Sequence, residues 1–149
     1  GVRKIISERM LTSLQSTAQL TLNTSVDASN LLACRKSLKS SPQMKELRKI
    51  NINDFLLYIV ANILPKFTAL NAHFLKDKIL EFKHVHLGFA VDSPRGLMVP
   101  IIHNAHLLSL EKISKEARRL SAACQEETIL PDELNGGTFT ISNLGTMGD

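Results

Sequence analysis

The sequence has 149 residues, of which 44% are hydrophobic, enough for one domain with a buried core. Its net charge of +4 comes from 18 basic residues interleaved with 14 acidic ones, with one tyrosine and no tryptophan, a pattern that argues against a nucleic-acid partner. No apolar run is long enough for a membrane span and the amino end is too charged for a secretory signal, so we expect a soluble intracellular protein without a membrane partner.

The first half of the chain predicts three helices and one strand. Apolar residues at helical spacing from Val2 to Leu14 predict an opening amphipathic helix. Residues 20–26 alternate like a strand, and Asp27 is expected to cap a second helix. After a polar break, Asn53 is expected to cap a third helix, with a wide apolar stripe from residue 55 to residue 67 that Pro65 bends or ends.

Four short strands are expected next, at residues 71–75, 79–82, 85–91 and 97–102, the last two joined by the turn sequence DSPRG. Alternate residues from Val85 to Val91 should share one buried face. Because the opposite face carries Gly88 and Ala90, we expect a helix or another subunit to pack closely there. Pro100 indicates a bulge or a sheet edge.

The chain is expected to close with a helix, a loop and a strand. Ser109 should cap the helix, Glu111 should pair with Lys115, and Leu110, Ile113, Ala117 and Leu120 should form its buried side. A loop over residues 127–137 then leads to a strand in the closing sequence GGTFTISNLGTMGD. The two cysteines, Cys34 and Cys124, are too far apart in the sequence for a Cys-x-x-Cys site and are expected to be reduced structural thiols.

The histidines suggest two kinds of site, a metal site and a catalytic base, and we favour neither. The DSPRG hairpin would bring residues near His86 opposite residues near 102, so the imidazoles of His84, His86 and His103 could converge. No acidic or cysteine side chain completes a metal-binding shell around them. We therefore predict no metal site. His73 and Asp77, four residues apart, have the spacing of a helical base and its orienting carboxylate, but the Asp-Lys dipeptide favours a turn between strands.

Four stretches together resemble the acyltransferase core of 2-oxo acid dehydrogenase complexes, the dihydrolipoamide acyltransferase family: RKIISERMLTSLQSTAQLTLNTSVDASNLLACRKSL, LNAHF, VHLGFAVDSPRGLMVPII and LPDELNGGTFTISNLG. The resemblance implies an α/β fold, an α+β sandwich similar to chloramphenicol acetyltransferase, with a mixed sheet and helices packed on one side. It also implies homotrimers that build a larger core, and transfer of an acyl group from dihydrolipoyllysine to coenzyme A.

The resemblance also assigns site residues. Ser142 matches the family's serine or threonine whose hydroxyl stabilises the oxyanion; by itself, a serine before a turn more commonly bonds to nearby backbone. Thr140 and Asn143 are expected to contact substrate. Arg95 could meet a phosphate of coenzyme A, although we favour a solvated turn residue. Coenzyme A is a substrate, the lipoyl group resides on a separate domain, and no metal is implied. The expected partners are that lipoyl domain and the decarboxylase and dihydrolipoamide dehydrogenase components.

The sequence departs from the family at its carboxyl end, because it contains no His-x-x-x-Asp-Gly motif, which supplies the family's catalytic histidine. We expect residues 1–149 to be a catalytic core that lacks this segment and the last strand of the sheet, has no lipoyl or subunit-binding domain, and is inactive alone. The acyl group is expected to be acetyl, and the location bacterial cytoplasm or mitochondrial matrix. The alternatives are a non-catalytic assembly fragment, or an acyltransferase of the same fold with succinyl, branched-chain or other specificity.

Overall fold

The computed structural model describes residues 2–40 and 46–143. Its α-helices are α1 (Val2–Ser16), α2 (Ser29–Ser40), α3 (Ile52–Ile63) and α4 (Leu110–Gln125). Its strands are β1 (Ala72–Leu75), β2 (Lys78–Glu81), β3 (Leu87–Phe89), β4 (Ile101–Ile102) and β5 (Phe139–Ile141). None of the helices in these residues combines the length and the apolar character that crossing a bilayer would require.

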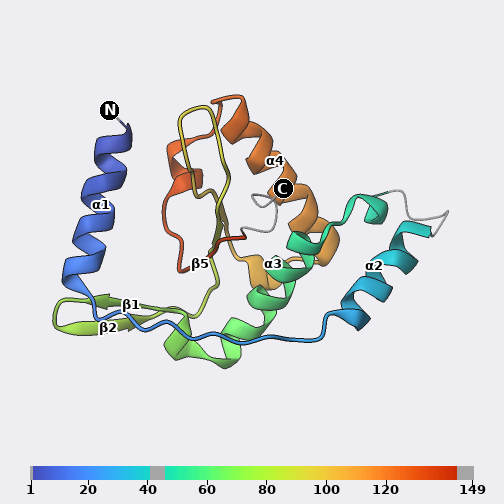
Figure 1. The fold of residues 1–149 in the computed structure, drawn as a ribbon, viewed down its shortest axis with the longest axis horizontal. Coiled ribbons are helices and arrows are strands. Elements are labelled where there is room, and N and C mark those ends of the chain that lie inside the picture. Colours follow the sequence, from blue (N-terminus) through green and yellow to red (C-terminus); the bar gives the residue numbers. More distant parts are fainter. Residues whose placement is uncertain (1, 41–45, 144–149) are drawn as a thin grey trace.

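The core lies between α3, α4 and a small mixed sheet with strand order β4-β3-β5 (Figure 1). Strand β3 pairs antiparallel with β4 and parallel with β5. Fully buried side chains from both helices and the sheet meet in one cluster, which includes Leu57, Ala61, Val85, Leu87, Ile102, Ile113 and Leu120. The predicted fold class, a mixed sheet with helices packed on one side, is confirmed for this part of the molecule.

The β3–β4 hairpin is close to its predicted register. Leu87 lies opposite Ile102, and beyond the strands Val91 and Met98 form an isolated antiparallel bridge. The turn is closed by the Ser93 hydroxyl, which donates to the Gly96 carbonyl oxygen over 2.6 Å. Since β4 lies at the edge of its sheet and starts directly after Pro100, the prediction of an edge at this proline is confirmed.

The expected close packing at Gly88 is confirmed, but the neighbours found within this chain do not belong to a helix. A Cβ atom at Gly88 would lie 2.9 Å from Val99 Cγ1 and 3.2 Å from Thr140 Oγ1, so side chains of the flanking segments fill this space.

The predicted helix α3 is present, but its cap is Asn51 and not Asn53. The Asn51 side chain accepts from the Asp54 N–H over 2.9 Å, and the Asp54 carboxylate accepts from the Asn51 N–H over 3.0 Å. This reciprocal capping box satisfies two donors at the helix start, which a cap at Asn53 would not do. The helix ends at Ile63, and Pro65 lies in the short 3-10 turn that follows, as predicted.

The predicted strand at residues 20–26 is wrong, because the segment forms no ladder in the described structure and runs extended from α1 to α2 (Figure 1). Its apolar side chains are almost fully exposed: Leu20 at 83%, Leu22 at 84% and Val26 at 82%. Alternation predicts a strand only where a partner strand and a buried face exist. Asp27 does act near the start of α2, accepting from the Ser29 N–H over 2.8 Å.

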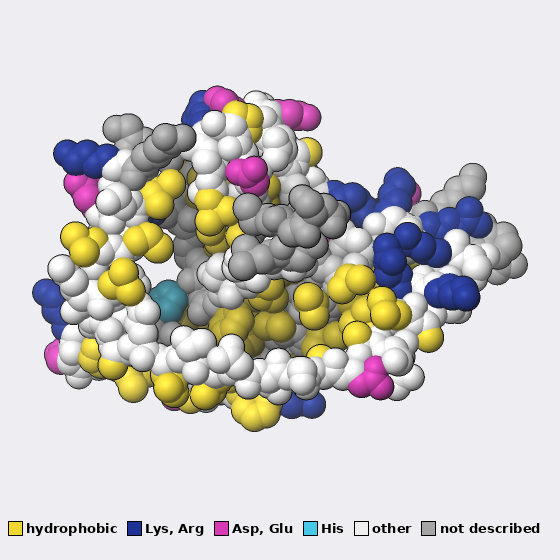
Figure 2. Space-filling view, in the orientation of Figure 1, with side chains coloured by type: hydrophobic (Ala, Val, Ile, Leu, Met, Phe, Trp, Pro, Cys, Tyr) yellow, Lys and Arg dark blue, Asp and Glu magenta, His cyan; other side chains and the backbone are white. Residues whose placement is uncertain are grey.

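The predicted amphipathic helix α1 exists, yet its apolar side chains are not buried. Ile5, Met10 and Leu14 are each more than half exposed. Figure 2 shows hydrophobic side chains on α1 and along the edge of the molecule below it. The apolar face of α1 is therefore available to another surface.

The other predicted elements are present, although the strands expected at residues 85–91 and 97–102 are shortened to β3 and β4. His73 and Asp77 belong to the β1–β2 hairpin, in which Leu75 pairs with Lys78, so the strand-turn interpretation holds. Ser109 caps α4 by accepting from the Lys112 N–H over 3.3 Å, and Lys115 forms a 2.8 Å ion pair with Glu111.

Candidate active site

Strand β5 carries Ser142 to an exposed position at the end of the sheet. Gly88 lies opposite Thr140 and Phe89 opposite Ile141 in the parallel pair. The last main-chain bond before Ser142 runs from the Ala90 N–H to the Ile141 carbonyl oxygen over 3.0 Å. Because Ser142 follows this anchor directly and is exposed, its hydroxyl lies at the surface beside the carboxyl end of β3.

The other end of β5 is anchored to His86. The Thr138 N–H donates to the His86 carbonyl oxygen over 2.7 Å, and the His86 N–H donates to Thr138 Oγ1 over 3.1 Å. Thr138 is buried, so these bonds are shielded from water. The chain enters through Gly136 and Gly137, where a Cβ on Gly137 would lie 2.7 Å from Ile101 Cδ1. Gly137 therefore leaves room for the Ile101 side chain beside the entry to β5.

Asn143 closely follows strand β5 and is hydrogen-bonded to helix α3. Its side-chain amide donates to Asn53 Oδ1 over 3.4 Å, in the first turn of α3. Asn53 was expected as a helix cap, and sequence reasoning missed this contact. The sequence NIND contains two asparagines that could cap the helix, and only the structure shows which one remains for Asn143.

A buried polar network fixes that first turn. Asp54, only 1% exposed, accepts from the Ser114 hydroxyl over 2.7 Å, and Arg118 Nη1 donates to the same Ser114 oxygen over 2.7 Å. The network joins α3 to α4, and so it holds Asn53 in place relative to the core. The network was not predicted, because in the sequence each of its residues occupies an ordinary position in a helix.

Thr140 and Arg95 occupy different surroundings. Thr140 is exposed on β5, with its hydroxyl toward the face where Gly88 lacks a side chain. Arg95 projects from the hairpin turn and pairs with Glu127, its Nε donating to Oε2 over 2.7 Å. Thr140 thus lies on β5, Ser142 directly follows that strand, and Asn143 is bonded to α3 through Asn53. Arg95 instead pairs with Glu127, just beyond α4.

Four histidines do come together, at the opposite end of β3. Ring centroids lie 5.0 Å apart for His86 and His103, 5.4 Å for His84 and His106, and 6.5 Å for His84 and His86. The Nδ1 atoms of His86 and His106 accept main-chain N–H groups. Within the described ranges, no group of three or more potential ligands has the arrangement to hold a metal ion.

The histidine cluster is too far from Ser142 to serve as its base. Ala90, which lies beside Ser142, is four positions beyond His86 in the sequence. That offset corresponds to about 13 Å along a strand. Burial, followed by the charges of the other three rings, lowers the pKa of His86. The arrangement thus presents a hydroxyl able to donate a hydrogen bond, while the imidazoles gather elsewhere.

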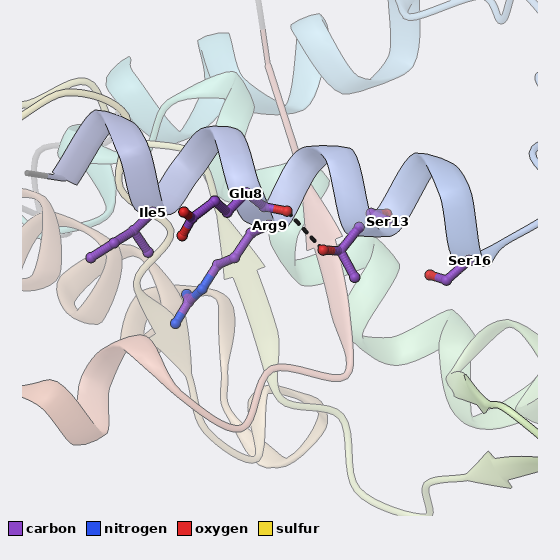
Figure 3. A pocket seen from close by; sticks show the side chains of 6 residues that line it. Ile5, Glu8, Arg9, Ser13 and Ser16 are labelled. Carbon is purple, nitrogen blue, oxygen red and sulfur yellow. Dashed lines mark hydrogen bonds between the residues drawn. The ribbon is translucent and has the colours of Figure 1, made fainter.

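A separate hollow lies along α1. Figure 3 shows Ile5, Glu8 and Arg9 among its lining side chains, and the lining also includes Thr12, whose hydroxyl donates to the Glu8 carbonyl oxygen over 2.8 Å. All six lining residues come from this single helix. A ligand there would be held from one side only, so we place the candidate site at Ser142.

Comparison with known proteins shows the family to which the chain belongs. Residues 1–149 match the model of the 2-oxoacid dehydrogenases acyltransferase catalytic domain. The chain is 34% identical to the dihydrolipoyllysine-residue acetyltransferase component of the Bacillus subtilis acetoin cleaving system, over 99% of this chain and 37% of that protein. It is 35% identical to the corresponding component of the Mycobacterium bovis pyruvate dehydrogenase complex, over 99% of this chain and 27% of that protein.

Solved structures agree. Azotobacter vinelandii dihydrolipoamide acetyltransferase, studied for the role of a serine, a histidine and an asparagine in its catalytic mechanism, superposes with a TM-score of 0.90 at 29% identity, covering 99% of this chain and 61% of that one. The chain thus spans about a third of the length of the curated relatives and about three fifths of this solved chain. The protein belongs to the 2-oxoacid dehydrogenase acyltransferase family, whose catalytic-domain model it matches from residue 1 to residue 149.

Proposed function

We propose that the chain forms part of an acyltransferase that moves an acetyl group from dihydrolipoyllysine to coenzyme A. The observation that carries the proposal is the exposed hydroxyl of Ser142, which directly follows a strand anchored at both ends, in a chain of this family. The acetyl group is favoured because the relatives named above are acetyltransferases of acetoin and pyruvate systems.

In this reaction a base takes the proton of the coenzyme A thiol, and the thiolate attacks the thioester carbonyl. A new carbon–sulfur bond forms, and the carbonyl oxygen becomes an oxyanion, to which the Ser142 hydroxyl donates a hydrogen bond. Collapse of this intermediate breaks the old carbon–sulfur bond and releases the dihydrolipoyl thiolate, which is reprotonated. Ser142 stabilises charge and is not the nucleophile.

In this family the resemblance implies that the base is the histidine of a His-x-x-x-Asp-Gly motif, and this sequence contains no such motif. We propose that the acyltransferase of which this chain forms part is a homotrimer, which builds a larger core, and that a histidine of that motif acts on coenzyme A from the neighbouring subunit. The solved structures that are similar to this chain include the cubic core of the pyruvate dehydrogenase multienzyme complex. The lipoyl group would arrive on a separate domain, and the decarboxylase and dihydrolipoamide dehydrogenase components would be the other partners.

Thr140 and Asn143 are proposed to contact the substrate beside Ser142. Arg95 is proposed as a turn residue that pairs with Glu127, with a coenzyme A phosphate as its alternative partner. Relatives include bacterial proteins and a mitochondrial component from Arabidopsis thaliana. Bacterial cytoplasm or mitochondrial matrix is therefore the proposed location.

Complementation tests the proposal. The chain is mixed with the catalytic core of the Azotobacter vinelandii enzyme carrying alanine at its own catalytic serine, and acetyl-coenzyme A formation is followed by chromatography. We expect no turnover from either protein alone and turnover from the mixture. Co-assembly without turnover would contradict the proposed role of Ser142, whereas turnover by the chain alone would contradict the need for an external base.

The exposed apolar surface favours a second candidate, a non-catalytic assembly fragment. Leu20, Leu22 and Val26 are each more than 80% exposed, as expected for side chains that another subunit covers. If this is the whole function, the chain will co-assemble with an intact core and Ser142→Ala will leave the activity of the mixture unchanged.

A further inference from the structure

The histidine cluster lies where β5 enters the sheet. His86 immediately precedes β3, and its main-chain N–H and carbonyl group both bond to Thr138, the residue before β5. The His86 ring reaches another segment, because its Nδ1 accepts the Asn104 N–H over 3.1 Å. One residue therefore joins the start of β3, the entry to β5 and the turn that follows β4.

The ring can hold this bond only in its neutral form. An Nδ1 atom that accepts a hydrogen bond has no proton, so the proton of neutral His86 is on Nε2. Protonation of Nδ1 would remove the acceptor and leave the Asn104 N–H facing another N–H. Asn104 has φ of 51°, a left-handed conformation that a hydrogen bond to the ring helps to hold.

Neighbouring groups oppose that protonation. The titratable groups acting on His86 are the imidazoles of His84, His103 and His106, and burial adds to their effect in lowering its pKa. His103, whose ring is 5.0 Å away, interacts in turn with the Glu133 carboxylate and has its Nε2 3.4 Å from the Asp132 carbonyl oxygen. Lys112, Lys115 and Glu116 line the hollow on the far side of His103.

The turn after β4 contacts the entry to β5. A Cβ at Gly136 would lie 3.7 Å from His103 Cε1, and one at Gly137 would lie 2.7 Å from Ile101 Cδ1. Gly137 has no room for a Cβ beside Ile101, whereas Gly136 has ordinary van der Waals spacing from His103. Because the entry to β5 thus lies against both Ile101 and the turn at residues 103–104, we expect a shift of that turn to disturb the entry. Strand β5 has only three residues, and Ser142 follows its last residue directly.

We propose that neutral His86 is a positioning residue that holds β5, and with it Ser142, in register, and that protonation of His86 releases the amino end of β5. The inference rests on the proposed function only for the role of Ser142. The coupling between His86 and β5 is a property of the fold and is measured without any substrate.

Hydrogen exchange of the 149-residue chain, followed by NMR at pH 7.5 and 4.5, tests this, because the lower pH lies well below the ordinary histidine pKa of 6.5 and the pKa of His86 is lowered from that value. Rates are expressed as protection factors, so that the intrinsic pH dependence of exchange cancels. We expect the protection of Thr138, whose N–H bonds to the His86 carbonyl oxygen at the amino end of β5, to fall about fivefold at pH 4.5, the factor for loss of one hydrogen bond of typical net strength. His86→Gln, whose amide oxygen can accept from Asn104 without titrating, should keep the same protection at both pH values.

His73→Gln is the matched control, because His73 lies on β1 and its ring contacts Phe82 outside the cluster. This variant should lose protection at pH 4.5 as the unsubstituted chain does. Equal protection at both pH values in the unsubstituted chain, or an undiminished fall in His86→Gln, would overturn the proposal.

A second measurement needs no substitution and covers the case in which His86→Gln does not fold. Long-range proton–nitrogen spectra of the unsubstituted chain report the tautomer and titration of each imidazole. His86 should be protonated on Nε2 and should titrate below the ordinary histidine range; a ring protonated on Nδ1 at pH 7.5 would refute the proposal. Absence of acyl transfer would count against the proposed function and leave these exchange results unaffected.

Discussion

The side-chain amide of Asn143 donates to Asn53 Oδ1 over 3.4 Å and so connects residues 90 positions apart in the sequence. Through this contact the residue beside Ser142 is attached to the first turn of α3. The strand before Ser142 is attached to β3, so the candidate hydroxyl is held from two directions.

Ser142→Ala should remove the oxyanion donor. In the complementation assay we expect acetyl-coenzyme A formation to fall roughly a hundredfold to a thousandfold, the usual effect of losing one preorganised donor. Ser142→Thr keeps a hydroxyl and should retain most of the activity. A Ser142→Ala variant that co-assembles and remains fully active would show that this hydroxyl has no catalytic role.

Asp54→Ala should destabilise the fold. The substitution removes the Asp54 carboxylate from the capping box of α3 and leaves the Ser114 hydroxyl, which itself accepts from Arg118, without its buried acceptor. From typical values for a cap and a charged hydrogen bond, the free energy of unfolding should fall by about 2 to 4 kcal/mol. Urea unfolding followed by circular dichroism measures this. Asp77→Ala, in the exposed β1–β2 turn, should change it by less than about 0.5 kcal/mol.

Gly88→Ala should strain the centre of the sheet. The added methyl group would lie 2.9 Å from Val99 Cγ1, and a β-branched side chain has little freedom to move away. We expect a loss of about 1 to 3 kcal/mol in unfolding free energy. Adding Val99→Ala opens the space and should make Gly88→Ala less damaging than it is in the Val99 background; an equal effect in both backgrounds would place the strain elsewhere.

The two thiols should react at very different rates. Cys34 is exposed on α2, whereas Cys124 is buried in α4 and burial raises the pKa of its thiol. Iodoacetamide at pH 8 should therefore modify Cys34 rapidly and Cys124 only on unfolding, as mass spectrometry of peptides would show. Cys34→Ser should abolish the fast phase. Rapid modification of Cys124 in the folded chain would contradict its burial.

Glu133 should contribute to acid sensitivity. The Leu130 N–H, and then Arg119, lower the pKa of this carboxyl below its ordinary value of 4.5. Because the folded state favours the charged form, the stabilisation is present above about pH 4.5 and is lost as the pH falls through the folded pKa. Glu133→Gln should therefore flatten the stability profile below pH 4.5, measured by thermal unfolding. Glu126→Gln, an exposed neighbour, should leave that profile unchanged.

Sequence patterns predicted the elements whose information is local. The α4 cap at Ser109, the end of α3 before Pro65 and the hairpin around DSPRG each depend on a few adjacent residues, and each is confirmed. A symmetric turn at DSPRG would bring residues near 86 opposite residues near 102, and Leu87 does lie opposite Ile102.

Features that depend on distant partners could not be predicted in the same way. The strand expected at residues 20–26 has the right alternation but no partner strand in the described structure, and the Asn53 side chain is used by Asn143 instead of the helix start. At the site, the family resemblance selected Ser142, whereas the Asp54–Ser114–Arg118 network became visible only once α3 and α4 were packed together.

The parallel pairing of β5 with β3 has a consequence for the order of folding. Its contacts join His86 to Thr138, 52 residues apart, whereas the β3–β4 hairpin closes between neighbours in sequence. Contacts between distant residues incur a larger loop-closure entropy, so we expect β5 to dock after the hairpin and after α4 has formed. The hydroxyl of Ser142 is then set in place by the last step of folding, and a partly folded chain would present no site to a substrate.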